Sequence, residues 1–421
     1  MPSWGEIGRQ IAEVDPALVS PAGSQFDIIR RKYLAKMHGL TGRATIVYAT
    51  KWTMPNVGAS VPPDMLSITA NDIHGFMEAV YGLTSRNLDL IIHSPGGSAE
   101  AAEAIVVYLR SKFDHIRVFV PHMAMSAATM LACAADQIVM GNHSFIGPID
   151  PQLQLQTAFG PRFVPAQAII QQFEMAQSES GDPVKIRAWL PMLSQYGPDL
   201  LATCINASEL SKTLVTEWLT KYMFKGQRSR HKKAEDIGNW LGSHSIFKTH
   251  SRPISRAVAE QHKLKIFKLE SDQALQDAVL SIYHATVHSL TSTGAVKIIE
   301  NHLGKAYLQV VQTMVVGMPA QQQPPQADIS AGSAVKCLVS SRERLPHLVV
   351  PAHSDEPGIA RSRPSICTAT GHGSDPLVPS GALIEGSSNC ASSPFSSAGC
   401  QSGNAARHPR SMGWRPAARA I

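Results

Sequence analysis

Residues 89–109 have the sequence DLIIHSPGGSAEAAEAIVVYL, and this stretch decides the fold class. The apolar run at 89–93 predicts a strand, and the pattern from residue 99 places apolar side chains on one face of a helix. The turn between them holds Gly96 and Gly97, which can adopt positive φ and bring the backbone close to a ligand. Free amides at such a turn bind negative charge. A simple helix start, with Ser98 as the N-cap, explains the same residues without any ligand.

A second unit of the same kind occupies residues 116–141, IRVFVPHMAMSAATMLACAADQIVMG, with a strand, a tight turn, a helix and another strand. Ser126 lies where the turn meets the helix. A nucleophile there gains from the helix dipole, and the N–H of Ala127 can face a developing oxyanion. A serine that merely caps the helix is the alternative interpretation.

The two turns are more informative together, because they can bring two separate amides to one carbonyl. The run ATIVYA (44–49) adds a further strand, and strands that alternate with helices predict a parallel sheet with crossover connections. The stretch GNHSFIGPIDPQLQ (141–154) follows the next strand, and we expect it to form a wall of the same cleft.

Composition separates a globular region from a tail. Hydrophobic residues make up 44% of the 421 residues, near the globular average. The pattern turns mostly helical from about residue 163, and beyond QQQPPQ (321–326) no period of 2 or 3.6 persists. We therefore expect four parts: an N-terminal helical segment at 1–40, a catalytic core at 41–160, a mostly helical C-terminal part at 161–316 and a low-complexity, disordered tail at 317–421.

The composition also argues against several classes of protein. Six scattered cysteines without a C-x-x-C pair do not support a disulfide scaffold, a zinc ribbon or a thioredoxin-like motif. The net charge of +6 is mild, and the basic stretch KGQRSRHKK (225–233) lacks interleaved aromatic residues, so no nucleic-acid partner is expected. Without a long apolar run or a signal-peptide core, the expectation is a cytoplasmic protein with no integral membrane segment.

The stretches SPGG, AMSAATM and HSFIGPIDPQ resemble those of the serine dehydrogenase proteinase family, which belongs to the Clp-protease/crotonase-like superfamily and is close to signal peptide peptidase A. The resemblance extends over about residues 1–310 through WGEI, RRKYLAKMHGLTGR (30–43), EWLTKYMF (217–224), KTHSRPIS (248–255) and AVKIIENHLGKAY (295–307). It implies an α/β fold with a Clp protease/crotonase-like spiral of ββα units and added C-terminal helices. It also implies a serine peptidase that acts on a protein or peptide substrate as a homo-oligomer and needs no cofactor.

The resemblance assigns roles to residues that match its motifs. Ser126 would be the nucleophile, and Gly97 and Ala127 would supply the two amides of the oxyanion hole, with Gly96 shaping the turn. An extended peptide would pair with strand edges beside the glycines.

The sequence leaves the general base open. Clp proteases place a histidine on the strand after the serine helix, where this chain has Asp150, and signal peptide peptidase A uses a lysine. A lysine base needs burial to lower its pKa, whereas an imidazole needs no such shift. Asp150, between two prolines, could instead orient a histidine. In order of preference, the candidates are Asp150, Lys212, His143, His122 and Lys185.

Two further functions and a metal site are alternatives to the serine peptidase. A scaffold that has lost the base, or a crotonase-type acyl-CoA enzyme that uses the same oxyanion hole on a thioester, would have the same fold. His284 and His288 lie at i, i+4 with His302 as a third ligand, but Ala285 stands where a zinc-protease motif has glutamate. No metal site is therefore predicted.

Overall fold

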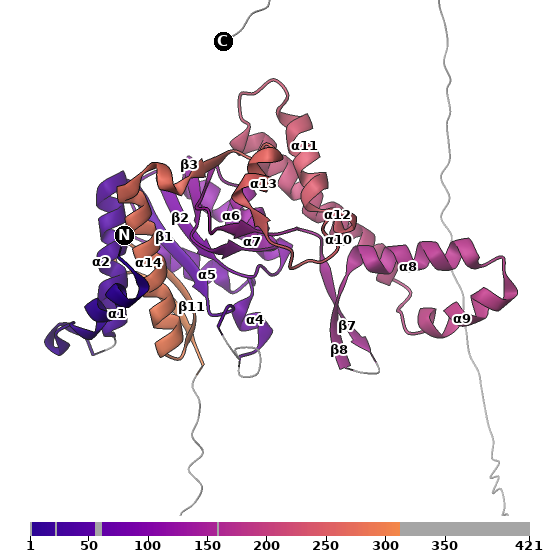
Figure 1. Cartoon of the computed structure of the whole chain (residues 1–421), viewed down its shortest axis with the longest axis horizontal. Coiled ribbons are helices and arrows are strands. Elements are labelled where there is room, and N and C mark those ends of the chain that lie inside the picture. The colour runs from indigo at the N-terminus through magenta and orange to yellow at the C-terminus, as the bar shows by residue number, and fades with distance from the viewer. Residues whose placement is uncertain (1, 22, 55–60, 158–159, 312–421) are drawn as a thin grey trace, which may run out of the picture. The chain divides into compact units, whose positions relative to one another are not determined.

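The computed structural model describes residues 2–21, 23–54, 61–157 and 160–311 (Figure 1). Its centre is a seven-stranded sheet with the order β10-β5-β3-β2-β1-β11-β12. The strands are β1 (Ala44–Thr50), β2 (Asn87–His93), β3 (His115–Val120), β5 (Gln137–Met140), β10 (Ile266–Lys268), β11 (Ala295–Asn301) and β12 (Ala306–Val310). The four strands expected from the sequence are therefore present.

The predicted parallel arrangement holds for five neighbouring strands and fails at one edge. β1, β2, β3, β5 and β10 pair in parallel, whereas β11 pairs antiparallel with both β1 and β12. The sheet is therefore mixed. The segment 295–310 has no regular alternation of polar and apolar residues, so its sequence does not distinguish a strand from a helix.

Alternation along the strands gives the sheet two apolar faces. In β1, Ile46 and Tyr48 pack with one core, and Val47 and Ala49 pack with the other. The first core includes side chains of α5 (Asp72–Val80), α6 (Ala99–Lys112), α7 (Ala127–Cys133), α10 (Leu200–Trp218) and α11 (Arg230–Leu241). The second includes those of α1 (Trp4–Ala12), α2 (Gln25–Thr41) and α14 (Gln273–Ser292), which lie side by side in Figure 1.

The segment after residue 163 is largely helical, as expected. Besides α10, α11 and α14, it contains α8 (Ala166–Glu179), α9 (Pro183–Leu193), the π-helix η2 (Leu219–Met223), α12 (His244–Phe247), α13 (Arg256–Gln261) and the 3₁₀ turn η3 (Leu269–Ser271). The N-terminal part adds the 3₁₀ turn η1 (Pro16–Leu18) and the short helix α4 (Pro63–Leu66). The tail expected from residue 317 lies outside the described residues.

Two smaller sheets lie beside the main one. One consists of β4 (Met123–Ala124), β6 (Phe145–Ile146) and β9 (Ile254–Ser255) in the order β4-β6-β9. The other is the hairpin β7 (Gln152–Thr157) and β8 (Gly160–Pro165), which packs with α8 and α10. Isolated bridges join Ser94 to Ala124 and Ile68 to Gly97, so the first small sheet meets the turn that follows β2.

No helix within the described ranges has both the length and the apolar character needed to cross a membrane.

Candidate active site

Ser126 lies in the turn between β4 and α7 with an unusual backbone conformation. Its φ is 51° and its ψ is −121°, a region that residues with a side chain rarely adopt. Its side chain makes no capping hydrogen bond to α7, so the interpretation of Ser126 as a simple N-cap is wrong. Ser98, by contrast, does cap α6, because its hydroxyl accepts the Ala101 N–H at 3.0 Å. Backbone strain of about 1–3 kcal/mol persists mainly where function requires it.

Small residues and one buried threonine hold the serine turn in place. The Ala128 N–H donates to the Met125 carbonyl at 2.9 Å and closes the turn. The Thr129 hydroxyl donates to the Ala124 carbonyl at 2.8 Å and accepts the Gly147 N–H at 2.9 Å. The turn is therefore fixed from the side of the helix and from the 145–150 segment.

The glycine turn lies directly against the serine turn. The Ser94 N–H donates to the Met123 carbonyl at 3.1 Å, and the Met125 N–H donates to the Ser94 carbonyl at 3.0 Å. A Cβ on Gly96 would lie 2.6 Å from the Cβ of Ser126, and a Cβ on Gly97 would lie 2.3 Å from the Ile68 carbonyl oxygen. Only glycine fits at these two positions, because the neighbouring atoms are backbone or part of the turn itself.

Several amides of these turns are free. Within the described ranges, the N–H groups of Gly97, Ser126 and Ala127 have no hydrogen-bond acceptor. The Ile68 N–H donates to the Gly96 carbonyl, and the Ile68 carbonyl accepts the Ser98 N–H, so the Gly97 N–H faces away from Ile68. Two free amides on adjacent turns are the donors that a developing oxyanion requires.

A buried carboxylate with two histidines forms the second part of the site. Asp150 is 1% exposed, and its two oxygens lie 2.9 Å from the Nδ1 atoms of His244 and His250. Because a carboxylate only accepts hydrogen bonds, each imidazole donates to it from Nδ1, and Nε2 is the ring nitrogen that points away from Asp150. The Asp150 carboxylate thus orients both rings.

One pocket of about 810 Å³ brings these groups together. Ser126, Gly96, Gly97 and His250 all line it. Its apolar wall includes Met123, Met125, Met130, Ile149, Leu153 and Leu210. The 149–154 segment forms part of this wall, as the sequence predicted for the stretch 141–154.

The other base candidates lie elsewhere. Lys212 packs its side-chain carbons beside Gly242, and exposed Lys185 pairs with Glu179 at 3.5 Å. His122 and His143 line a separate cavity of about 350 Å³ together with Tyr283 and His284. The structure therefore does not bring these four candidates into the pocket of Ser126.

Sequence reasoning missed His244 and His250. Both follow Ser126 by more than a hundred residues, and a fold is needed to bring them to Asp150. The available signal was the stretch KTHSRPIS (248–255), which contains His250 and resembles the family, but no role was assigned to it.

The histidines considered for a metal are engaged in other contacts. His288 stacks on Trp4 with ring centroids 3.7 Å apart, and His302 stacks on His38 at 3.9 Å. Over residues 2–311, apart from the undescribed gaps, no group of three or more His, Cys, Asp or Glu side chains is arranged to hold a metal ion.

The buried His93, at the end of β2, is expected to make the free energy of unfolding depend on pH in the acid range. Its ring is buried, stacks on His122, and has its pKa lowered to about 3, mainly by burial. Between about pH 6.5 and 3, His93 is therefore protonated in the unfolded state and neutral in the folded state. The fold loses stability as the pH falls through this range. His93→Gln should flatten the pH dependence of the unfolding free energy there by up to about 1.4 kcal/mol per pH unit. Urea unfolding at a series of pH values measures it, and an unchanged slope would contradict the prediction.

Comparison with known proteins assigns the class. Residues 64–183 match the family model of the ClpP-like SDH-type serine proteinases. This region is therefore similar to the ClpP-like SDH-type serine proteinases, which confirms the resemblance seen in its motifs. Asp150 lies inside the matched region, whereas His244 and His250 lie beyond it.

Individual relatives cover only parts of the chain. The uncharacterized protein MJ0137 of Methanocaldococcus jannaschii is 34% identical over 130 residues, which are 31% of this chain and 45% of that protein. The uncharacterized protein MJ1495 of the same organism is 41% identical over 88 residues, 20% of this chain and 30% of that protein. The chain thus spans less than half the length of either relative.

Two solved structures are also similar to part of the chain. A serine-to-alanine mutant of the 1510-N membrane-bound stomatin-specific protease is 14% identical and covers 48% of this chain and 74% of its own, with a TM-score of 0.29. A lysine-to-alanine mutant of that protease, in complex with a substrate peptide, is 14% identical and covers 52% and 93%, with a TM-score of 0.23.

Proposed function

We propose that this chain is a serine peptidase that hydrolyses peptide bonds through an acyl-enzyme on Ser126. His250 is the general base in this proposal, Asp150 orients it, and the amides of Gly97 and Ala127 bind the oxyanion. The observation that carries the proposal is that Ser126 and the Asp150-bound His250 line one pocket. A serine, a histidine and a carboxylate in this relation are the parts of a hydrolytic triad, whatever their order in the chain.

The reaction begins when Ser126 Oγ attacks the peptide carbonyl carbon. His250 Nε2 takes the hydroxyl proton as the new C–O bond forms, and the negative charge on the former carbonyl oxygen is bound by the Gly97 and Ala127 amides. When the tetrahedral intermediate collapses, the C–N bond breaks and the imidazolium of His250 protonates the leaving amine. The product of this half-reaction is an ester on Ser126 and a free amine.

The second half-reaction regenerates the enzyme. Water attacks the ester carbonyl, and His250 accepts one of its protons. The ester C–O bond then breaks, the acid product leaves, and Ser126 Oγ regains the proton from His250. In this proposal the Asp150 carboxylate stabilises the imidazolium that forms in each half-reaction.

His244 has a different role in this proposal. Its Nδ1 occupies the second oxygen of Asp150, and His244 does not line the pocket of Ser126. We infer that His244 fixes the orientation of the Asp150 carboxylate, which in turn orients the His250 ring. Since Asp150 contacts both rings and does not line the pocket, it is proposed as a positioning acid and not as the base.

Several finer expectations belong to the same proposal. We propose a protein or peptide as the substrate and a homo-oligomer as the assembly. We also propose that the chain is divided into the four parts 1–40, 41–160, 161–316 and 317–421. The small sheet beside the main sheet supports a spiral of ββα units. A cytoplasmic location stays a prediction.

A peptide-library assay on the purified full chain tests the activity. Cleaved peptides identified by mass spectrometry, with hydrolysis lost in Ser126→Ala, are the expected result. A chain that hydrolyses acyl-CoA thioesters but no peptide would favour the crotonase-type alternative, because that reaction uses the oxyanion hole without needing the serine. A folded chain inactive on both would favour the scaffold.

A further inference from the structure

A buried ion pair lies behind the glycine turn. Lys297 of β11 and Asp72 of α5 have fully buried side chains, and Lys297 Nζ lies 2.7 Å from Asp72 Oδ1. Lys297 Nζ also donates to the Ser67 carbonyl at 2.7 Å. Desolvation of two charges offsets much of the attraction between them, so stability is a weak reason for such a pair. Its connections indicate another role.

The first connection runs through the backbone of Ile68. Ser67 is bound to Lys297, and the Thr69 N–H donates to Asp72 Oδ2 at 3.2 Å, so both neighbours of Ile68 are tied to the ion pair. Ile68 in turn donates to the Gly96 carbonyl at 2.7 Å and accepts the Ser98 N–H at 3.0 Å. The ion pair therefore sets the position of the backbone against which the glycine turn is bonded.

The second connection runs through two hydroxyl groups. The Tyr48 hydroxyl donates to Asp72 Oδ2 at 2.8 Å, and Ser94 Oγ accepts the Gly96 N–H at 3.2 Å. Burial and Asp72 raise the pKa of Tyr48 well above its usual value, whereas the nearby Ser94 hydroxyl acts on that pKa in the opposite direction. The hydroxyls of Tyr48 and Ser94 thus lie between the carboxylate of Asp72 and the amide of Gly96.

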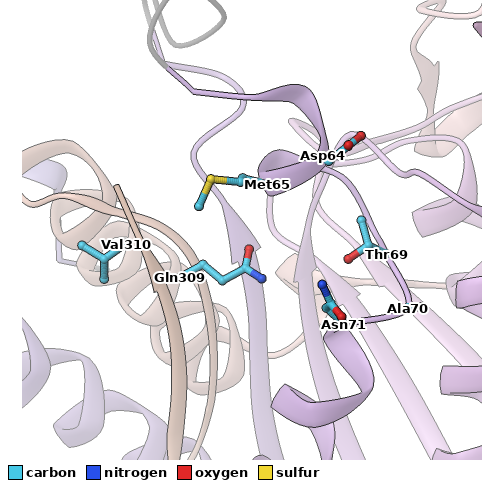
Figure 2. Close-up of a pocket in the computed structure, with 7 residues that line it drawn as sticks. All are labelled: Asp64, Met65, Thr69, Ala70, Asn71, Gln309 and Val310. Carbon is cyan, nitrogen blue, oxygen red and sulfur yellow. The ribbon is translucent and has the colours of Figure 1, made fainter. Parts of the chain in front are cut away.

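The loop that these bonds hold borders a second cavity, although its Ile68 side chain is buried in the core. A cavity of about 510 Å³ lies on the other side of the loop, lined by Asp64, Met65, Thr69, Ala70, Asn71, Gln309 and Val310 (Figure 2). Asp64 and Thr69 line both this cavity and the pocket of Ser126. Figure 2 shows Thr69 and Asn71 on the loop before α5, with Gln309 extending toward them from β12. The loop is therefore held by the buried Ile68 side chain together with the hydrogen bonds of its backbone.

We propose that Lys297, Asp72, Tyr48 and Ser94 form a positioning network that holds the Gly96–Gly97 turn so that the Gly97 amide faces the oxyanion. This inference rests on the proposed peptidase function. None of the four side chains lines the pocket of Ser126, so they act through the backbone of the turn and not on the substrate. The network matters most in the transition state, where the oxyanion carries charge.

The test removes single groups from the network in the full chain. Tyr48→Phe and Ser94→Ala each delete one hydroxyl, and Lys297→Met deletes the buried charge. We expect kcat for a peptide substrate to fall by about 10- to 100-fold, less than the 10²–10³ typical of losing an oxyanion donor outright. KM should change by less than about 2-fold, since the ground state does not use the network. The inhibition constant of a peptide aldehyde, which forms an oxyanion on Ser126, should rise by the same factor as kcat falls.

Matched controls separate positioning from a structural effect. Tyr33→Phe removes a buried tyrosine hydroxyl bonded to Gln10, and Ser281→Ala removes a buried serine hydroxyl bonded to the Asp277 carbonyl, both outside the site. These two variants should keep the kcat of the parent protein. Tyr48→Phe and Ser94→Ala keep the test decisive if Lys297→Met does not fold.

The outcomes distinguish this inference from the proposed function. If the parent protein hydrolyses peptides and Tyr48→Phe and Ser94→Ala keep full kcat, the network is not a positioning device and the peptidase proposal stands. If the control variants lose activity as the network variants do, the effect is structural and the inference is again wrong. If the parent protein hydrolyses no peptide and forms no aldehyde adduct, the peptidase proposal itself fails, and the inference with it.

Discussion

Ser126→Ala is expected to lower kcat for peptide hydrolysis by up to about 10⁶-fold, because the proposed acyl-enzyme forms on the Ser126 hydroxyl. The fold should survive the change. Ser126 makes no capping hydrogen bond to α7, so the helix start loses no contact when the hydroxyl is removed. A fluorogenic peptide measures kcat, and the thermal midpoint reports folding.

The control for this variant is Ser281→Ala, which removes a buried serine hydroxyl from α14 and should leave kcat unchanged. A folded Ser126→Ala protein that keeps more than about a tenth of the parent activity would contradict the assignment of the nucleophile. Residual hydrolysis far above the uncatalysed rate is still expected, since the oxyanion amides and the binding pocket remain.

The second large effect is expected at His250. His250→Ala should lower kcat by roughly 10⁴-fold, because Ser126 then has no base, whereas His244→Ala should cost far less, about 10-fold. The two histidines form a matched pair, since each lies 2.9 Å from one oxygen of Asp150 and only His250 lines the pocket. Kinetics on the same peptide substrate measure both variants.

A third variant tests the lysine alternative directly. Lys212→Met should retain kcat within about 2-fold, since the Lys212 side chain lies beside Gly242 and outside the pocket of Ser126. If Lys212→Met were inactive while His250→Ala stayed active, the general base would be a lysine and not a histidine.

Equal losses in His244→Ala and His250→Ala would mean that the Asp150 carboxylate needs both rings to orient the base.

Local pattern was sufficient to predict the central strands and the two turns. The apolar runs of β1, β2, β3 and β5 and the Gly96–Gly97 and Ser126 turns all follow from short-range periodicity and turn chemistry. β11 and β12 were not predicted as sheet strands: β11 pairs with β1, about 250 residues away in sequence, and β12 joins the sheet only through β11. Such pairing leaves little trace in either segment alone.

The general base could not be predicted from the sequence for the same reason. The sequence favours Asp150 as a titratable residue near the serine, or as a group that orients a histidine, but neither His244 nor His250 is near it in sequence. The hydrogen bonds that join them depend on how α12 and the loop after it return to the 149–151 turn. The buried network around Lys297 was equally invisible, since it joins four separate elements of the fold.

Covalent labelling of the full chain with a fluorophosphonate probe tests the central claim most directly. The account predicts one label, located by mass spectrometry on Ser126, absent in Ser126→Ala and formed much more slowly in His250→Ala. A folded protein that acquires no label, or one labelled on a different serine, would contradict the claim that Ser126 is an activated nucleophile.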